Sequence, residues 1–460
     1  MKASSGIEVM VRLERSSGES LRAQLERQLR ESVRSGALRH GAALPSSRAL
    51  AGELGIARGV VTEAYSQLAA EGYLVASQGA PTRVAAASTV DEGAPLPDDE
   101  ERPPRFDFRP GEPDPALFPR AAWAGAVRQA LREAPDARFG YGSARGLPEL
   151  RRALATYLGR VRGVVADPET IIVTAGVTQG LTIAGRALLA HGVRTLAVED
   201  PGSVFMRGPL GALGLELVPV PVDADGLDVD ALDRSGAGAV LVTPAHQYPT
   251  GVVLAPERRA ALRAWGGWVL EDDYDAEFRY DRAPVGALQG LDRERVIYLS
   301  SLSKTLAPAL RMGWLVPPPE LAEDMRREKH RADRGSALLE QLGLAVLLER
   351  GELDRHLRRS RLAYRRRRDA LAGALARHMP HARPHGAAAG LHLLVELPGL
   401  DEAALLASAA AAGVGLEGLS EHTIEPGPPA NILGYGCIPE PAIEPGIRRL
   451  AELVGAAAAG

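Results

Sequence analysis

The strongest constraint on the fold is a break in composition at residues 85–105. This stretch reads AAASTVDEGAPLPDDEERPPR, is rich in proline and acidic residues, and contains no aromatic residue. Such a segment has too little apolar surface to form a packed core, so it behaves as an extended, solvated linker. The chain of 460 residues is therefore predicted to fold as two separate pieces, residues 1–84 and residues 106–460.

The bulk composition is typical of an ordinary globular protein. Hydrophobic residues make up 45% of the chain and charged residues 24%, and the net charge of −4 argues against nucleic-acid binding by the whole surface. Cys437 is the single cysteine, which excludes an internal disulfide and fits a reducing compartment. Neither a signal-peptide core nor an apolar run of the ~20 residues that cross a bilayer is visible. We expect a cytoplasmic protein with no membrane partner and no metal site.

The front piece has the pattern of three short helices followed by a β-hairpin. The second helix is predicted to begin after an N-cap at Ser46 and to end at Gly55, and the third to end at Gly72. Residues 73–85 predict two short strands around a glycine-containing turn. The apolar positions that mark the inner faces of the three helices are Leu21, Leu25, Leu29, Val33, Leu50, Leu54, Val61, Tyr65 and Leu68.

Two short helices joined by a tight turn and followed by a hairpin form a winged helix-turn-helix. Residues 1–84 hold eleven Lys and Arg against eight Asp and Glu, a mild basic excess. Because helix N-terminal amides and arginines suit phosphates and base edges, we expect DNA contacts from the starts of the second and third helices. The expected DNA-binding residues are Ser46, Arg48, Arg58 and Thr62. From spacing alone, a three-helix domain with solvated arginines is an equal alternative.

The front piece resembles the GntR-type winged helix from Leu21 to Val84, through LPSSRALAGELG and ARGVVTEAYSQLAAEGYL. The resemblance implies that the third helix enters the major groove of DNA. Two departures stand out. Ala57 occupies the position of the usual serine N-cap, at a cost of about 1 kcal/mol, and the wing turn GAPTRV lacks a second glycine. Neither departure removes the arginines, so DNA binding is the favoured interpretation.

In the back piece, apolar β-rich runs alternate with helical stretches. The runs are TIIVTAG, TLAVEDPG, LELVPVPVD, AVLVTPAH, GWVLEDDYD, VIYLSSLSK and GWLVPPP. This alternation predicts an α/β unit with a largely parallel sheet that is covered on both faces. Ligands of such sheets bind at the carboxyl ends of the strands, where Gly176, Asp272, Tyr274 and Lys304 fall.

The stretch SSLSKTLAPALRMGW suits a phosphate-bearing aldehyde. Its lysine, Lys304, can bond the aldehyde, while hydroxyls and the guanidinium of Arg311 can hold the phosphate. Alone, this motif is better explained as a solvated loop lysine. Three further elements change that balance. Asp272 can pair with a pyridine nitrogen, TAGVTQG directs backbone amides toward an anion, and PAHQYPTG supplies a polar turn.

Together these elements resemble the fold-type I aminotransferases from Phe106 to about Leu453. The resemblance implies pyridoxal 5'-phosphate (PLP) as the cofactor and a smaller C-terminal α+β lobe beside the main sheet. Matching positions imply that Lys304 forms the Schiff base, that Asp272 pairs with the pyridinium and that Tyr274 donates to the phenolate oxygen. The implied phosphate ligands are Ser301, Ser303, Arg311 and the amides of Val177 and Thr178. Tyr141 is implied to reach the phosphate across a homodimer interface, and Gly111 to lie near the substrate mouth.

Two cofactor contacts depart from the aminotransferase pattern. Tyr248 replaces the asparagine of the NPTG motif, which bonds the cofactor phenolate. Ser203 stands where an aromatic ring usually stacks on the pyridine, so Phe205 or His246 is expected to substitute for that ring.

The carboxylate clamp of aminotransferases is also missing. The stretch ANILGYGC places Asn431 or Ile432 where an arginine usually binds the substrate carboxylate. Losing a charge-assisted contact costs roughly 1.5–3 kcal/mol, so an amino-acid substrate should bind poorly. Arg207 is a candidate replacement, although a solvated loop arginine is its favoured role.

The arginine-rich stretch RRSRLAYRRRRDALAGAL predicts the long helix that links the two lobes of this fold. Leu362, Leu371 and Leu375 are expected to face inward. The arginines are expected to form a solvated face, with auxiliary DNA contact as the alternative.

A GntR-like winged helix joined to an aminotransferase-like domain is similar to the MocR/GabR regulators. The resemblance implies a cytoplasmic, homodimeric, PLP-dependent transcription regulator. Its back domain would sense PLP or an amine or amino-acid effector through the Lys304 aldimine. The rival hypothesis is an active aminotransferase with an auxiliary DNA-binding domain. A repressor that never binds cofactor conflicts with the retained Lys304, Asp272 and Arg311.

Overall fold

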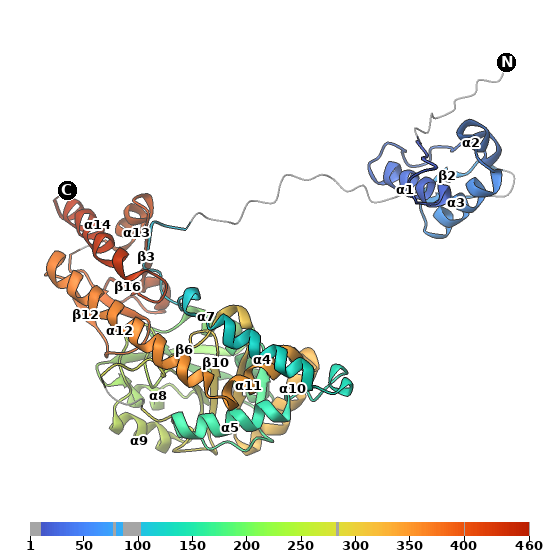
Figure 1. The fold of residues 1–460 in the computed structure, drawn as a ribbon. Helices are drawn as coiled ribbons and strands as arrows, with labels where there is room; N and C mark the ends of the chain where they lie inside the picture. Colours follow the sequence, from blue (N-terminus) through green and yellow to red (C-terminus); the bar gives the residue numbers. More distant parts are fainter. Residues whose placement is uncertain (1–10, 77–79, 86–102, 282–284, 400, 460) are drawn as a thin grey trace. The chain divides into compact units, whose positions relative to one another are not determined.

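The computed structural model of the protein describes residues 11–76, 80–85, 103–281, 285–399 and 401–459. The chain divides into two compact units, Met1–Arg102 and Pro103–Gly460, coloured from blue to red along the sequence in Figure 1. This division falls inside the stretch that its composition marks as a linker. Most of that stretch, residues 86–102, lies outside the described residues, as do residues 77–79 of the wing turn.

The first unit consists of three helices and a two-stranded antiparallel sheet. Its elements are α1 (Leu21–Arg34), α2 (Ser47–Leu54), α3 (Arg58–Ala70), β1 (Leu74–Val75) and β2 (Arg83–Val84). The Ser46 side chain caps α2 by accepting the Ala49 N–H at 3.2 Å, and Gly55 ends that helix with a φ of 63°. No described side chain caps α3 at Ala57, as the sequence predicts. The winged helix-turn-helix is thus confirmed.

The core of the first unit uses the predicted helix faces with one addition. Leu25, Leu29 and Val61 are fully buried, whereas Leu21 at the first turn of α1 is only half-buried. Gln24 is also buried, which the apolar pattern could not predict. Its side-chain amide donates to the backbone oxygens of the preceding segment and therefore costs little to bury.

The second unit is built on an eight-stranded sheet with the order β4-β11-β10-β9-β8-β5-β6-β7. The strands are β4 (Ile172–Thr174), β5 (Thr195–Asp200), β6 (Glu216–Asp223), β7 (Gly226–Leu227), β8 (Ala239–Val242), β9 (Trp268–Asp272), β10 (Val296–Ser301) and β11 (Gly313–Val316). The neighbours from β10 through β9, β8 and β5 to β6 run parallel, whereas β11 and β7 are antiparallel. The predicted mostly parallel sheet is confirmed.

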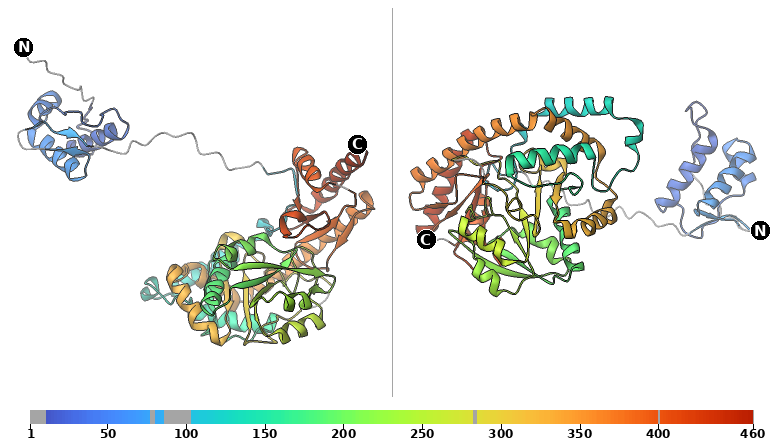
Figure 2. Two further views of the ribbon diagram at one scale, coloured as in Figure 1. Left: turned by 180° about the vertical axis from the view of Figure 1, so that it is seen from behind. Right: turned by 90° about the horizontal axis from the view of Figure 1, so that it is seen from below.

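Helices cover both faces of this sheet, as Figures 1 and 2 show. They are α4 (Arg120–Glu133), α5 (Pro148–Arg162), α6 (Val177–Ala190), α7 (Val204–Gly211), α8 (Val229–Arg234), α9 (Pro256–Trp265), α10 (Ala322–Asp333) and α11 (Leu338–Glu349). Alternate residues of β8 enter two different cores, because successive strand side chains point to opposite faces. Leu241 packs with α6, α7 and α10, and Val240 packs with α8 and α9. This arrangement explains why β8 is apolar throughout and why β9 and β10 each begin with an uninterrupted apolar run.

A smaller C-terminal lobe completes the unit. It contains α12 (Glu352–His378), β12 (Arg383–His385), β13 (His392–Glu396), α13 (Glu402–Ala411), β14 (Val414–Gly415), β15 (Glu417–Gly418), β16 (Ala430–Gly434) and α14 (Glu440–Ala459). Four of these strands form an antiparallel sheet in the order β12-β13-β16-β15. The early strand β3 (Phe106–Asp107) pairs with β14, so the start of the second unit belongs to this lobe. No described helix combines the length and apolar character needed to cross a bilayer.

The long helix α12 corrects one prediction. Leu371 and Leu375 are buried, but Leu362 is 61% exposed. Nine residues separate Leu362 from Leu371, which is two and a half helical turns, so the two side chains lie on opposite faces. Several arginines of this helix also point inward: Arg361 donates to the Glu277 carbonyl at 2.7 Å, and Arg367 bonds Asp114. The arginine-rich stretch is therefore only partly a solvated face.

Candidate cofactor site and DNA-binding surface

A cavity of about 370 Å³ opens at the carboxyl ends of β9 and β10. Nine of the ten side chains predicted to contact the cofactor line it, namely Val177, Thr178, Tyr248, Asp272, Tyr274, Ser301, Ser303, Lys304 and Arg311. They come from five different segments of the sequence. Parallel strands bring these segments together because their carboxyl ends meet along one edge of the sheet.

Lys304 lies three residues after the end of β10 and lines this cavity. Its Nζ donates to the carbonyl of Gly111, a residue whose φ of 107° favours glycine. Burial lowers the pKa of Lys304, against the opposing effect of the Asp275 and Asp272 carboxylates. A lowered pKa increases the fraction of neutral amine, which is the form that attacks an aldehyde.

Asp272 ends β9 and presents an unsatisfied carboxylate to the cavity. Its Oδ1 is buried and has no hydrogen-bond partner among the described residues. Burial and the neighbouring Asp273 raise the pKa of Asp272 well above its ordinary value. A buried acceptor without a partner is costly, so this oxygen calls for a donor, and the protonated ring nitrogen of a pyridine provides one.

The other acidic residues of EDDYD have structural partners. Asp273 forms a buried ion pair with Arg162 at 2.6 Å, and Tyr298 donates to the same carboxylate at 2.6 Å. Asp275 contacts the His246 Nδ1 at 2.9 Å. Only Asp272 of this run therefore combines a place in the cavity with a free buried oxygen among the residues that the structure describes.

The N-terminus of α6 forms a corner suited to an anion. Gly176 precedes the helix with a φ of 93°, and no described side chain caps it, so the first amides of α6 stay available. A Cβ on Gly176 would lie 3.3 Å from the Arg311 Nη2, which shows that the guanidinium sits against this turn. Arg311 itself adopts a φ of 46°, an uncommon conformation for a residue with a side chain. Amides, guanidinium and the nearby serine hydroxyls together fit a phosphate.

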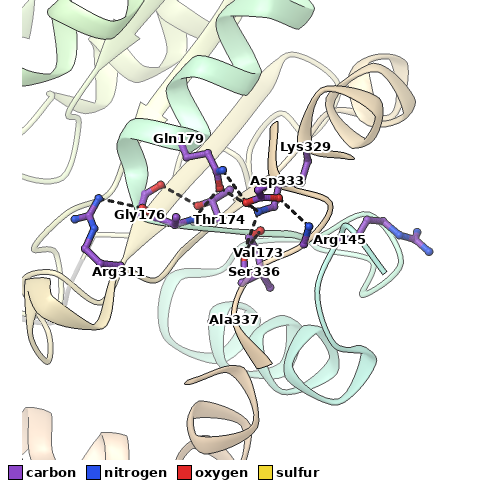
Figure 3. Close-up of polar contacts among 12 residues, drawn as sticks. Arg145, Val173, Thr174, Gly176, Gln179, Arg311, Lys329, Asp333, Ser336 and Ala337 are labelled. Atoms are coloured by element: carbon purple, nitrogen blue, oxygen red, sulfur yellow. Dashed lines mark hydrogen bonds and ion pairs between the residues drawn. The ribbon is translucent and has the colours of Figure 1, made fainter. Parts of the chain in front are cut away.

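A network between α6 and α10 holds this corner in place (Figure 3). Lys329 is fully buried, and its Nζ donates to Gln179 Oε1 at 3.1 Å and to Ser336 Oγ at 2.9 Å. The Gln179 amide donates to Asp333 at 2.8 Å, and its oxygen accepts the Ala175 N–H at 2.8 Å. The network therefore fixes the first turn of α6, which carries the predicted phosphate-binding amides.

The small lobe supplies cavity residues that sequence reasoning missed. Glu417 from β15 and His392 from β13 line the cavity. The Tyr248 hydroxyl donates to Glu417 Oε1 at 3.0 Å, and its ring lies 5.0 Å from that of His392, measured between centroids. Neither residue belongs to a motif, so only the β16-centred sheet, which brings the small lobe against the loop after β8, could reveal them.

Two of the expected substitutes do not reach the cavity. Arg207 in α7 is buried and lies 3.9 Å from Asp200, so it is neither a solvated arginine nor one of the described residues that line the site. His246 is occupied by Asp275 and is likewise absent from the described lining. Ser203 and Phe205 do line the cavity, although Phe205 is 72% exposed.

The carboxylate-clamp position is buried and uncharged. Asn431 and Ile432 lie inside β16, and neither is among the described residues that line the cavity. Arg311, at the α6 corner, is the one arginine in that described lining. The described lining therefore offers a ligand carboxylate no second guanidinium.

Tyr141 is the predicted cofactor contact that lies elsewhere. Its side chain is 94% exposed and borders a different cavity, together with Gly335 and Ser336. The ring of Tyr141 therefore does not contact the cavity of its own chain.

In the first unit, the four predicted DNA contacts are all exposed. Ser46 and Arg48 lie at the start of α2, and Arg58 and Thr62 at the start of α3. The Arg58 Nε donates to Ser47 Oγ at 3.3 Å, so the two helix starts lie side by side. One surface therefore carries both arginines and both helix N-termini, which suits phosphates and base edges.

Comparisons with known proteins agree with both units. The family model for class I and II aminotransferases matches residues 111–415, and that for bacterial regulatory proteins of the gntR family matches residues 21–84. The chain is 34% identical to the probable rhizopine catabolism regulatory protein MocR of Rhizobium meliloti, over 90% of each chain. It is 35% identical to the pyridoxine biosynthesis transcriptional regulator PdxR of Corynebacterium glutamicum, over 78% of this chain and 80% of that protein.

A solved structure extends the comparison. The α-aminoadipate aminotransferase LysN of Thermus thermophilus, complexed with N-(5'-phosphopyridoxyl)-L-leucine, is 28% identical with a TM-score of 0.70 and covers 77% of this chain and 93% of its own. The fold and the cavity thus define a PLP-dependent aminotransferase-like unit that follows a winged helix. The chain belongs to the MocR-type transcription regulators, in which a gntR-family unit precedes a class I and II aminotransferase unit.

Proposed function

We propose that PLP in the cavity of the second unit controls how the winged helices bind operator DNA. The observation that carries this proposal is the buried Oδ1 of Asp272, which has no partner among the described residues and faces the same cavity as Lys304. The residues present fit PLP, because a ring-nitrogen partner, an amine for the aldehyde and an anion corner lie in one cavity. When bound, PLP supplies an aldehyde that amines bond reversibly and a ring that withdraws electrons.

Each predicted residue has a role that its surroundings support. Asp272 accepts from the ring nitrogen, and Lys304 presents its amine to the aldehyde. Tyr274 stays a hydrogen-bond donor because burial raises its pKa well above the ordinary value. The phosphate is held by Ser301, Ser303, Arg311 and the amides of Val177 and Thr178, and Tyr248 orients the phenolate side through its link to Glu417.

The regulator acts in the cytoplasm as a homodimer in this proposal. An operator with two half-sites binds two copies of the first unit. In the second unit, the exposed Tyr141 can contact the phosphate of PLP in the cavity of the partner chain. The effector is PLP or an amine that enters the same cavity. An effector can shift the regulator only if it binds the two states with different affinity.

A gel shift on the DNA upstream of the protein's own gene, titrated with PLP, tests the proposal. PLP is expected to change the apparent Kd of the wild-type chain, to leave that of Lys304→Ala unchanged, and to act on Asp272→Asn only at about 10- to 100-fold higher concentration. Arg48→Ala and Arg58→Ala are expected to weaken DNA binding whether or not PLP is present. Identical titration curves for wild type and Lys304→Ala would contradict the proposal.

Aminotransferase activity is a second candidate because Lys304 and Asp272 are both retained in the cavity. The absence of a second arginine from the described lining argues for slow turnover of amino acids. Single-turnover absorbance measurements on the PLP-loaded chain with a panel of amines distinguish the two. A turnover rate of roughly 1–1000 s⁻¹, which is typical of enzymes, would favour aminotransferase activity as the function.

A further inference from the structure

The small-lobe side of the cavity carries two carboxylates. Glu417 lies on β15, and Glu112 lies in the segment after β3, where its carbonyl accepts from the Cys437 thiol at 3.4 Å. Glu112 is exposed to solvent and forms no ion pair with any residue that the structure describes. The two cationic side chains of the described lining, Lys304 and Arg311, are assigned above to the aldehyde and the phosphate.

The charge of Glu417 is not cancelled by its neighbours. The fully buried His422 accepts the Val204 N–H on Nδ1 at 3.5 Å, so its proton is on Nε2, which donates to Glu417 at 2.6 Å. His422 is then a neutral donor. The other donor is the Tyr248 hydroxyl, and burial raises the pKa of Tyr248 well above its ordinary value, so it also stays neutral. Hydrogen bonds from Tyr248 and His422 hold the Glu417 carboxylate in a fixed orientation at the cavity wall.

A ligand carboxylate on this side would meet like charges and no guanidinium from the described lining. A ligand ammonium group would instead meet Glu417 in the partly buried wall of the cavity, where charge interactions are stronger than in water, and the exposed Glu112 adds a further negative charge to the same lining. We propose that the effector of this regulator is a primary amine that carries a second cationic group and no carboxylate. The first amine enters at the Lys304 end, and the second cation lies beside Glu417. This inference rests on the proposed function, because the amine binds beside PLP.

Three five-carbon probes test the charge preference with the PLP-loaded full chain. They are 1,5-diaminopentane, pentan-1-amine and 5-aminopentanoate, which share a primary amine and differ only at the far end. Binding is followed by calorimetry and by the absorbance of bound PLP. We expect 1,5-diaminopentane to bind at least tenfold more tightly than 5-aminopentanoate, with pentan-1-amine between them. Higher salt should reduce the differences in affinity between the probes, since screening weakens charge interactions.

Two variants place the preference on the named residues. Glu417→Gln keeps a hydrogen-bond acceptor for Tyr248. It should reduce the ratio between the Kd of 5-aminopentanoate and that of 1,5-diaminopentane at least threefold. Glu112→Gln, at an exposed position where the substitution should not affect folding, should also reduce this Kd ratio. Glu257→Gln, on the exposed first turn of α9, is the matched control and should leave this Kd ratio unchanged.

The outcomes separate this inference from the proposed function. If the wild-type chain gives no absorbance of bound PLP, the proposed function fails and this inference fails with it. If PLP binds but 5-aminopentanoate binds as tightly as 1,5-diaminopentane, the inference alone is overturned. It is also overturned if the preference exists and neither glutamate variant changes it.

Discussion

At the scale of single residues, Asp272 shows how a buried acceptor can define a ligand. Its Oδ1 has no partner among the described residues, so a ring nitrogen would supply the missing donor. We expect Asp272→Asn to weaken PLP binding about 10- to 100-fold, because a charge-assisted hydrogen bond contributes roughly 1.5–3 kcal/mol. Fluorescence titration with PLP measures the change. Asp233→Asn, on the exposed side of α8, is the control, and equal affinities for the two variants would refute the role.

Glu199 gives a second residue-scale prediction. It is buried beneath Thr243, and burial raises its pKa to about 7 from an ordinary value of 4.5. The folded chain therefore holds more protons than the unfolded chain between these values. The stability that Glu199 contributes is fully present below pH 4.5 and is lost as the pH rises through about 7.

Glu199→Gln should reduce this loss of stability by about 2 kcal/mol between pH 5 and 7. Urea unfolding of the PLP-free chain, followed by tryptophan fluorescence, measures it for the second unit alone, because Trp123, Trp265, Trp268 and Trp314 all lie there. Glu257→Gln should keep the wild-type slope. A variant slope equal to that of wild type would show that Glu199 does not titrate in this range.

Which site residues could be predicted depended on their place along the chain. Asp272 ends one strand that begins with an apolar run and Lys304 follows another by three residues, so the apolar runs and the positions after them identify both. Glu417 lies in a two-residue strand of the small lobe and reaches the cavity only through tertiary packing. The burial of Arg207 is not predictable from the sequence, because α7 is a short helix whose buried face no local pattern reveals.

At the scale of elements, the packing of α10 against α6 supports the anion corner. Lys329 is buried, and its removal would leave the acceptors of Gln179 and Ser336 with one donor fewer. We expect Lys329→Met to destabilise the second unit by about 1–3 kcal/mol and to weaken PLP binding several-fold, because the α6 amides lose their fixed position. PLP titration and urea unfolding measure the two effects. Arg331→Met, exposed on the same helix, should change neither.

The uncapped start of α3 yields an element-scale prediction in the first unit. Ala57 has φ −66° and ψ 136°, an extended conformation that suits an N-cap serine. Ala57→Ser should therefore stabilise α3 by about 1 kcal/mol. Hydrogen exchange of amides 58–70 in the full chain should slow about fivefold, with residues 177–190 as the internal reference. Ser46→Ala should have the opposite effect on α2, and unchanged exchange in both variants would contradict the capping argument.

Element positions were predictable where the apolar period was clear and less so elsewhere. The strands β8, β9 and β10 are buried along their whole length, as continuous apolar runs predict. The prolines of β6 mark a strand near the edge of the sheet, and its side chains are mostly half-exposed. In α12, Leu362 is exposed although it was predicted to face inward, because at 3.6 residues per turn it lies opposite Leu371.

At the scale of the whole molecule, composition alone predicted two units, but it carries no information on which chain completes the cavity. Tyr141 is exposed and lies outside the cavity of its own chain, so we expect it to serve the partner of a homodimer. Co-expression of a Tyr141→Ala chain and a Lys304→Ala chain, each with its own affinity tag, tests this. In the mixed dimer, one cavity combines an intact Lys304 with the intact Tyr141 of the other chain.

That mixed dimer should bind one PLP per two chains with wild-type affinity. The Tyr141→Ala homodimer should bind PLP more weakly. The Lys304→Ala homodimer should lack the absorbance of lysine-bound PLP. The restored site is a consequence of geometry, since neither variant chain holds a complete set of residues. If Tyr141 acted within its own chain, every cavity of the mixed dimer would lack one of the two side chains. Affinity no better than that of the Tyr141→Ala homodimer would therefore exclude a shared cavity.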